Sequence, residues 1–415
     1  MKQSIGLVLL QIFGILLGLI SVFWVAGSLP AEEYAIVGIY NIISALIVVF
    51  SNTGFETYAI RNVLAWREAG ENDKIKLIVS QAIIYRMILA ILVFIPLIGY
   101  IVYISLNKFE GQYFSLFFTM GLLSVSNAFN DSTILILKAF NKYFVAALAT
   151  YTINVFGKLA ALLLFIKFGF GTYIWTIILL PVFVSIPLIY MLKDWFSFKN
   201  VFKKEYVIDS LKKSKFFALS AYLSYASSYL DQLIVSIFMS PEVIGAFTLS
   251  KSILQIVISF IENIFDPLIQ NLVRFKNDIF EFRNKMKFIF KIRNIVLILS
   301  ILGLPILVAY INDILALLKI DHYPYLNYFI IFIYLSQIGH IAMKVKYSYI
   351  SLFHHPKFYL NLMVFRTSLS IFLLAIILFI NVKYVFTYIL ITNLFLIGYT
   401  NHIYRNMNKS NIYIK

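Results

Sequence analysis

The chain has 415 residues, of which 61% are hydrophobic and 13% are charged, and its formal net charge is +16. A charged share about half that of soluble domains excludes a soluble enzyme and a nucleic-acid-binding domain, because so much apolar surface cannot be hidden from water. The chain has no cysteine, which excludes disulfides and thiolate metal sites.

Long unbroken apolar runs predict an all-α, multi-pass membrane protein, whereas a membrane barrel would show short alternating segments. One span takes about 20 apolar residues, so the apolar content is enough for roughly twelve. In chain order we predict spans over residues 5–27, 34–55, 77–104, 113–137, 144–166, 172–192, 216–239, 243–269, 288–311, 325–343, 358–380 and 384–403. The first is longer than a signal-peptide core and is expected to be retained.

The distribution of basic residues predicts the orientation. With the N-terminus inside, 27 of the 35 Lys and Arg residues fall in cytoplasmic segments and only four in external loops. Because cytoplasmic loops carry the excess of Lys and Arg, both termini are expected in the cytoplasm. This asymmetry also explains the positive charge without a nucleic-acid partner.

The chain contains an internal repeat. A shift of about 210 residues lays the first six spans over the last six, so that residues 55–56 fall on 265–266 and residues 100–101 on 310–311. Both halves start on the same side, which indicates a parallel repeat of the kind that transporters carry. We predict an N-terminal six-helix bundle over 1–192, a cytoplasmic linker over 193–215 and a C-terminal six-helix bundle over 216–415.

Polar residues form stripes along three of the predicted spans. At helical spacing they lie on one face of each span, because residues three and four apart share a face. The stripes consist of Asn41, Ser44, Asn52 and Glu56 on span two, Ser220, Ser224, Ser227, Ser228 and Asp231 on span seven, and Thr248, Lys251, Ser252, Gln255, Ser259, Glu262, Asn263 and Asp266 on span eight. Such stripes indicate a water-filled cavity or, alternatively, hydrogen bonds between packed helices.

Four basic residues fall in the interior of spans, away from the span ends, namely Arg86, Lys158, Lys251 and Arg366. An ionisable residue at a central helix position costs about 2.5–3.5 kcal/mol on insertion scales, so each needs a partner or water. One interpretation is a cationic cavity that accepts an anionic headgroup at successive depths. The other is that each cation pairs with a carboxylate and only holds helices together, as Asp131 would do for Arg86 and Asp231 for Lys251.

Carboxylates inside the spans are candidates for coupling to an ion gradient. Asp231, Glu262 and Asp266 are candidate proton or sodium sites, and the cavity lining is expected to include Glu56, Asp131, Gln255, Asn263 and Ser224. We expect no metal site, because His354 and His355 have no further ligands at metal spacing. The chain has no P-loop motif, and no cofactor is expected.

Short motifs between the spans resemble a known family. Residues 29–34 (LPAEEY) resemble its "LGPEEYG" turn, residues 240–247 (SPEVIGAF) its "xxxEVGxYxxA" segment, residues 231–234 (DQLI) its "DqliL" and residues 137–142 (LKAFNK) its "LqalgK" turn. With the twelve-span pattern over nearly the whole length, the chain resembles the Wzx-type polysaccharide (O-antigen or capsule) repeat-unit flippases of the MOP (multidrug, oligosaccharidyl-lipid, polysaccharide) superfamily.

The resemblance implies a MATE-like fold with two six-helix bundles around a central cavity lined by spans one, two, seven and eight. It implies alternating access rather than covalent catalysis. The expected cargo is an undecaprenyl-pyrophosphate-linked oligosaccharide that crosses from the cytoplasmic to the outer leaflet of a bacterial inner membrane, with a proton or sodium ion as a possible coupling partner.

Two other functions stay open at this stage. A multidrug exporter of the same superfamily would favour acidic cavity residues, because its cargo is cationic. A glycan polymerase or ligase would carry a long external loop, whereas the longest external segment here is residues 312–324. A scramblase or a purely structural role is also open.

Overall fold

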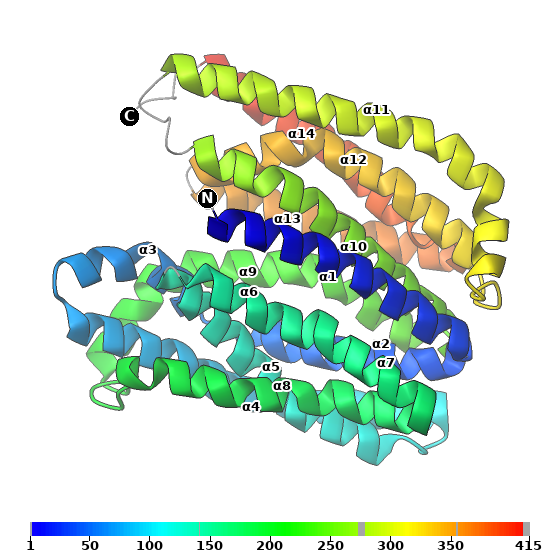
Figure 1. Ribbon diagram of the computed structural model, residues 1–415, viewed down its shortest axis with the longest axis horizontal. Coiled ribbons are helices and arrows are strands. Elements are labelled where there is room, and N and C mark those ends of the chain that lie inside the picture. The colour runs from blue at the N-terminus through cyan, green and yellow to red at the C-terminus, as the bar shows by residue number, and fades with distance from the viewer. Residues whose placement is uncertain (1, 141, 273–278, 354–355, 410–415) are drawn as a thin grey trace. The chain divides into compact units, whose positions relative to one another are not determined.

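The computed structural model describes residues 2–140, 142–272, 279–353 and 356–409, and in these ranges the chain is helical, without strands. Figure 1 shows long helices joined by short connections. The helices up to the middle of the chain are α1 (Lys2–Ser28), α2 (Ala31–Phe50), α3 (Phe55–Glu68), α4 (Asn72–Phe109), α5 (Phe114–Ala139), α6 (Tyr143–Tyr151), α7 (Gly157–Phe168) and α8 (Phe170–Leu192). The remaining ones are α9 (Lys204–Phe238), α10 (Pro241–Asn271), α11 (Ile279–Leu317), α12 (Leu326–Phe353), α13 (Pro356–Ile380) and α14 (Thr387–Lys409).

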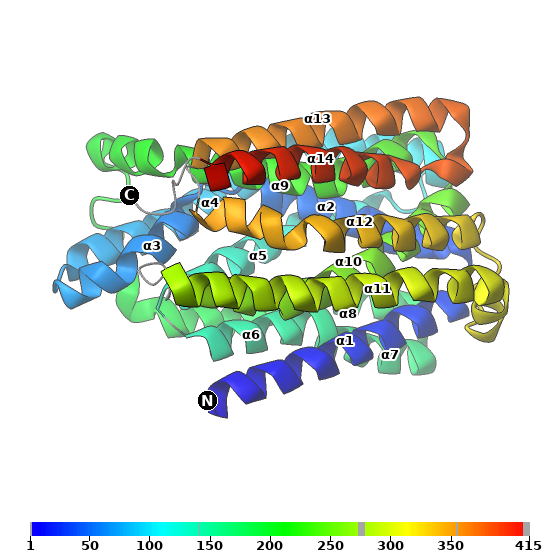
Figure 2. The ribbon, with the colours of Figure 1, turned by 90° about the horizontal axis from the view of Figure 1, so that it is seen from above.

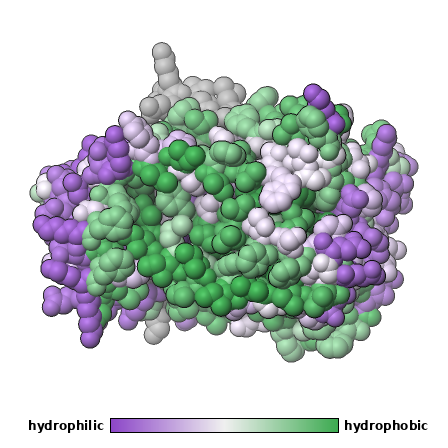
Figure 3. All heavy atoms as spheres, turned by 90° about the horizontal axis from the view of Figure 1, so that it is seen from below, coloured by the Kyte–Doolittle hydropathy of each residue, from purple (hydrophilic) through white to green (hydrophobic). Residues whose placement is uncertain are grey.

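The helices have the length and composition of membrane spans. In the described part of the chain, eight segments are long and apolar enough to cross a bilayer, and two shorter apolar stretches lie at Leu16–Ser28 and Tyr229–Phe238. Eleven of the twelve predicted spans fall largely on one helix each, and the span 144–166 covers α6, the π-helix Thr152–Phe156 and α7. On the face drawn in Figure 3, apolar residues fill the middle and hydrophilic residues gather at the two ends. The protein is therefore an all-α membrane protein, as the sequence predicted.

Contacts divide the chain into two compact units. The first comprises residues 1–25 and 31–245, and the second comprises residues 26–30 and 246–415. We describe each unit by itself. The predicted boundary between two six-helix bundles, on either side of the segment 193–215, stays a prediction.

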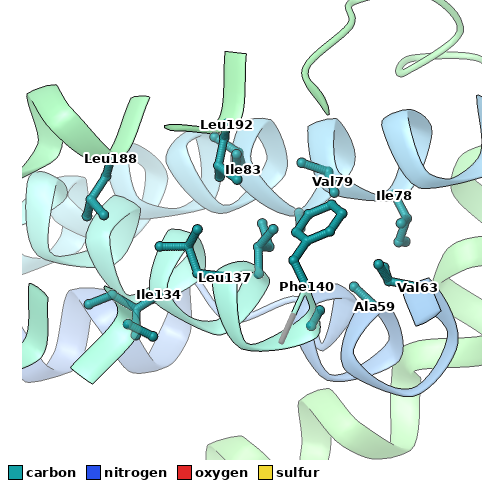
Figure 4. Packing of buried hydrophobic residues seen from close by; sticks show 14 of the residues in the cluster. Ala59, Val63, Ile78, Val79, Ile83, Ile134, Leu137, Phe140, Leu188 and Leu192 are labelled. Atoms are coloured by element: carbon teal, nitrogen blue, oxygen red, sulfur yellow. The ribbon is translucent and has the colours of Figure 1, made fainter. Parts of the chain in front are cut away.

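The first unit has an apolar core where α3, α4, α5 and α8 meet. Figure 4 shows Val63 of α3, Val79 of α4, Leu137 of α5 and Leu188 of α8 directed toward one another around Phe140. All five are buried. The apolar stripe of each helix faces this core, as ridge-into-groove packing requires.

The segment predicted as a linker packs on α4. Ser197 N donates to Ser80 Oγ at 2.8 Å, and Ser210 Oγ donates to Gln81 Oε1 at 2.7 Å. From Lys204 onward this segment is already the first part of α9. Buried hydrogen bonds thus tie its polar residues to the first unit.

The second predicted span is shorter than expected. It was predicted to run to residue 55, but α2 ends at Phe50 and α3 starts at Phe55. Gly54 has φ 74°, a left-handed value that a side chain disfavours, and Asn52 Oδ1 accepts a hydrogen bond from Gly54 N at 2.8 Å. Thr53 Oγ1 accepts another from Phe55 N at 3.3 Å. The side chains of this turn therefore cap the start of α3 and stop the helix that precedes it.

In the second unit, α12 packs on α11 and α14, and α13 contacts α12 and α14. Figure 2 shows α12 and α13 running in opposite directions beside α14. One end of the unit is held by three buried rings, with Phe386 stacked on Phe247 at 4.7 Å between ring centroids and on edge to Phe329 at 5.2 Å. The helix α12 continues ten residues beyond the predicted end of span ten at residue 343. Lys344, one residue beyond the predicted end of span ten, lies within this helix and is 6% exposed.

Candidate functional site

The most deeply buried charge in the described structure is Arg86 on α4, which has no exposed surface. Its Nη1 donates to Glu56 Oε1 at 2.8 Å, and its Nη2 donates to Asp131 Oδ2 at 2.5 Å and to the Val48 carbonyl oxygen at 3.0 Å. The planar fork of the guanidinium allows it to bind two carboxylates from different helices at once. Arg86 thus connects α2, α3, α4 and α5.

The position of this cluster follows from the break between α2 and α3. Val48 lies in the last turn of α2, where carbonyls lack helical partners and attract a cation. Glu56 lies in the first turn of α3, where the helix dipole favours an anion. The guanidinium of Arg86 therefore bridges the two facing helix ends, and the turn between them places Glu56 against it.

The two carboxylates of the cluster differ in their surroundings. Glu56 is 1% exposed and its Oε2 has no hydrogen-bond partner, whereas the Asp131 side chain is 32% exposed. Two carboxylates against one guanidinium leave one excess negative charge in a buried place. The cluster thus has the composition of a site that accepts a monovalent cation, although helix anchoring requires the same ion pairs.

Further polar groups of α5 form hydrogen bonds inside the first unit. Asn127 Nδ2 donates to Ser44 Oγ at 2.8 Å, and the buried Asn130 donates from Nδ2 to the Pro181 carbonyl at 2.7 Å. Asn130 Oδ1 also accepts from Ser185 Oγ at 2.8 Å. In this unit, part of the predicted polar stripe is satisfied by packed helices, which is the second of the two alternatives considered for it.

Lys158 lies in α7 directly after an irregular turn. Residues Thr152–Phe156 form a π-helix between α6 and α7. The helix α8 approaches Gly157 closely, because a Cβ added at this glycine would clash with Leu180 Cδ2. Lys158 is half-buried, on the same face as the buried residues Val155 and Leu162. Its Nζ has no hydrogen bond or ion pair to the described residues. A π-helical turn of this kind often marks a functional position.

The second unit contains a polar stripe on α12 that the sequence analysis missed. This stripe starts at Gln337 and continues three, seven and eleven residues later with His340, Lys344 and Ser348, which share one face of the helix. Gln337 and Lys344 are buried, and His340 is half-buried with Nε2 shielded from solvent and without a hydrogen-bond partner. The stripe could have been found from its spacing, but Lys344 had been taken to mark the end of the span.

The other predicted site residues are distributed over both units. Asp231 on α9 is 3% exposed and belongs to the first unit, whereas Lys251 on α10 is 4% exposed and belongs to the second. The predicted ion pair between them therefore stays a prediction. Gln255 is half-buried on α10, and Arg366 is half-buried on α13.

Some predicted residues cannot be placed. Ser224 lies on α9, and Glu262, Asn263 and Asp266 lie on α10, but their side chains are outside the described part of the structure. The two histidines considered for a metal, residues 354–355, are outside it as well. Among the residues that are described, no group of three or more imidazole and carboxylate side chains is arranged to hold a metal ion.

Comparisons with known proteins agree with this architecture. Residues 1–270 match the family model described as "Polysaccharide biosynthesis protein". Among curated protein sequences, none matches the chain.

Solved structures with a similar fold are transporters. An inward-facing multidrug resistance MATE family transporter of the MOP superfamily is 15% identical, with a TM-score of 0.70 over 96% of this chain and 94% of that one. A mutant of the Vibrio cholerae MATE transporter VcmN is 14% identical, with a TM-score of 0.56 over 100% and 98%. At such identities the likeness shows the fold alone.

Proposed function

Because the chain belongs to the polysaccharide biosynthesis protein family and has the fold of the MOP-superfamily transporters, we propose that it is a flippase for a lipid-linked oligosaccharide. Its substrate is an undecaprenyl-pyrophosphate-linked repeat unit, which it moves from the cytoplasmic to the outer leaflet of a bacterial inner membrane. Both termini lie in the cytoplasm, in agreement with the distribution of basic residues.

The observation that carries this proposal is the pair of cations Lys158 and Arg366. Arg366 lies within a helix that is long and apolar enough to cross a bilayer, and Lys158 lies within the predicted fifth span. Neither has a hydrogen bond or ion pair to the described residues. An uncompensated cation at such a depth costs about 2.5–3.5 kcal/mol. A phosphorylated substrate that passes these positions supplies the missing negative charge, so it is stabilised where a cationic drug would be repelled.

The mechanism requires two states of the protein. The isoprenoid tail stays in the bilayer while the diphosphate and the sugars cross it through the protein, as in alternating access. Substrate binding shifts the equilibrium only by its differential affinity for the two states. We propose that Asp231, Glu262 and Asp266 bind the coupling proton or sodium ion, and that Glu56 and Asp131 contribute to the same charge balance.

A multidrug exporter is the second candidate, because the solved transporters with this fold that we describe above are MATE proteins. It would need a site for a cation. The Arg86 cluster, with its excess carboxylate, is the feature of the first unit that favours this alternative.

Deleting the gene tests the two functions against each other. The flippase proposal expects lipid-linked glycan to accumulate on the cytoplasmic leaflet, with unchanged susceptibility to cationic drugs. Complementation with Lys158→Gln or Arg366→Gln is expected to leave at least about tenfold less surface glycan than the wild type, because each substitution removes one compensating charge.

The matched control is Lys167→Gln, since Lys167 is an exposed lysine on the same helix as Lys158. It is expected to restore surface glycan fully. Increased drug susceptibility of the deletion strain, with normal glycan, would instead support the exporter. Full complementation by both Gln variants, at normal levels of inserted protein, would remove the charge argument.

A further inference from the structure

Three basic side chains meet inside the second unit, on α12 and α13. Lys344 and His340 lie one turn apart on α12, and Arg366 lies on α13. His340 is subject to the positive charge of both Arg366 and Lys344. The carboxylates with described side chains in this unit are Glu281, Asp313 and Asp321, which lie near helix ends or in a connection rather than at this depth.

The packing of the two helices independently places these groups together. Tyr347 OH of α12 contacts Met363 Sδ of α13 at 3.4 Å, and Met343 and Leu362 share one apolar cluster. Because α12 and α13 run antiparallel (Figure 2), moving three residues back along α12 corresponds to moving three residues forward along α13. Lys344 therefore lies opposite Arg366, and His340 lies about one turn further along.

Two of the three basic groups have no partner among the described residues. His340 Nε2 is buried without a hydrogen bond, and Arg366 makes no hydrogen bond or ion pair to the described residues. A buried polar atom of this kind is unfavourable when it stays unsatisfied. Arg86 of the first unit, in contrast, is matched by two carboxylates. The second unit thus contains the donors of an anion site.

Polar side chains continue the site toward α14. Ser370 Oγ donates to Thr392 Oγ1 at 3.3 Å, and Asn393 Nδ2 donates to the Ser336 carbonyl at 2.9 Å. Gln337, one turn from His340, is 5% exposed and has an Oε1 without a hydrogen-bond partner. An amide oxygen beside the donors of Arg366 and His340 suits a ligand that has both anionic oxygens and hydroxyl groups.

We propose that His340, Lys344 and Arg366 form a diphosphate-binding subsite inside the second unit. The guanidinium of Arg366 offers parallel donors to two phosphate oxygens, and Lys344 and His340 add point contacts. Arg366 lies about 15 Å along α13 from Pro356, and His340 about 20 Å along α12 from Phe353, so the subsite is near the middle of a bilayer of ~30 Å. It rests on the proposed function and specifies where the pyrophosphate of a lipid-linked substrate resides at mid-passage.

The test is direct binding to the purified full-length protein in detergent micelles. Farnesyl diphosphate serves as the probe, with farnesyl monophosphate, inorganic pyrophosphate and phosphatidylglycerol as competitors. The Kd for farnesyl diphosphate is expected to rise about tenfold or more in Arg366→Gln and about threefold or more in His340→Gln. Arg366→Lys keeps the charge but loses the fork, so its Kd is expected between those of the wild type and Arg366→Gln.

Arg283→Gln is the matched control in the same unit. Arg283 is an exposed arginine near the start of α11, with no hydrogen bond or ion pair to the described residues. Its loss is expected to leave the Kd within about twofold of the wild type. Thermal unfolding of each variant identifies any that misfold. His340→Gln then tests the subsite while the guanidinium of Arg366 stays in place.

The outcomes separate the subsite from the function. Binding to the wild type that is unchanged in Arg366→Gln and His340→Gln overturns the subsite and leaves the flippase proposal intact. Absence of farnesyl diphosphate binding to the wild type overturns both. Competition by inorganic pyrophosphate supports recognition of the diphosphate itself, whereas equal competition by phosphatidylglycerol or farnesyl monophosphate shows a general phosphate-lipid contact and overturns the specificity for diphosphate.

Discussion

Replacing Arg86 by Gln is expected to destabilise the protein strongly. The guanidinium is fully buried, and its removal leaves Glu56, which is 1% exposed, as a buried charge without a donor. Breaking such a pair by removing one partner costs about 3–5 kcal/mol. The contact with Asp131 adds little, since that side chain is 32% exposed and is solvated more easily.

A double-mutant cycle separates the ion pair from the packing of its members. Glu56→Gln alone is expected to cost about 1–2 kcal/mol, because Arg86 keeps Asp131 and gains a neutral acceptor. The double variant Arg86→Gln/Glu56→Gln contains no orphaned charge at this pair. We therefore expect it to be more stable than Arg86→Gln by about 2 kcal/mol, which together with the cost of Glu56→Gln gives a coupling energy of about 3–4 kcal/mol in magnitude.

Equilibrium unfolding in mixed micelles with increasing SDS measures these energies. Trp66 on α3 packs on Tyr58 at 5.7 Å between ring centroids, so its fluorescence reports on the helix that carries Glu56. Arg293→Gln is the control for loss of an arginine elsewhere and is expected to cost less than about 1 kcal/mol. If Arg86→Gln costs no more than this control, or if the double variant is no more stable than the single one, the cluster does not carry the stability assigned to it.

Two further substitutions test the packing of the first unit by thermal unfolding in detergent. Gly54→Ala is expected to lower stability more than Gly70→Ala by about 1–3 kcal/mol. Both glycines have a left-handed φ, 74° and 73°, so the backbone strain of the substitution is the same. Only at Gly54 would the added Cβ meet another part of the backbone, 2.7 Å from Ala218 N. Asn130→Ala is expected to cost about 1–3 kcal/mol, because its amide donates to the Pro181 carbonyl and accepts from Ser185 in a buried place.

Each of these two stability predictions can be contradicted by a specific result. Equal losses for the two glycine variants would mean that α9 does not approach the turn at Gly54 as closely as described. Asn107, an exposed residue of α4, provides the reference for Asn130, and similar unfolding temperatures for Asn130→Ala and Asn107→Ala would show that the buried hydrogen bonds contribute nothing.

The spans were predictable because hydropathy depends on local sequence alone. A helix that crosses hydrocarbon must be apolar along about 20 residues, whichever partners it has. The end of α2 was missed although residues 51–54 read Ser-Asn-Thr-Gly, a cluster typical of a turn, because an apolar run precedes this cluster. The turn depends on the φ of Gly54 and on the backbone contacts of Asn52 and Thr53, which appear only in the structure.

The candidate site was predictable in part. The proximity of Asp131 to Arg86 followed from their depths along two neighbouring helices, and the structure shows it. Glu56 was placed on the same stripe as Asn41, but it belongs to the next helix and reaches Arg86 through the turn. Lys344 was left out of the polar stripes because it follows the predicted end of span ten at residue 343, whereas α12 continues to Phe353 and buries its side chain.

The π-helical turn at Thr152–Phe156 determines the direction in which Lys158 points. A π-turn accommodates one residue more than an α-helical turn, and each residue of an α-helix adds 100° of rotation. In a regular α-helix of the same sequence, the additional residue would rotate every later position by about 100°, whereas the π-turn absorbs it. Deleting one residue from this segment would therefore restore a continuous α-helix and leave Lys158 on nearly its present, half-buried face.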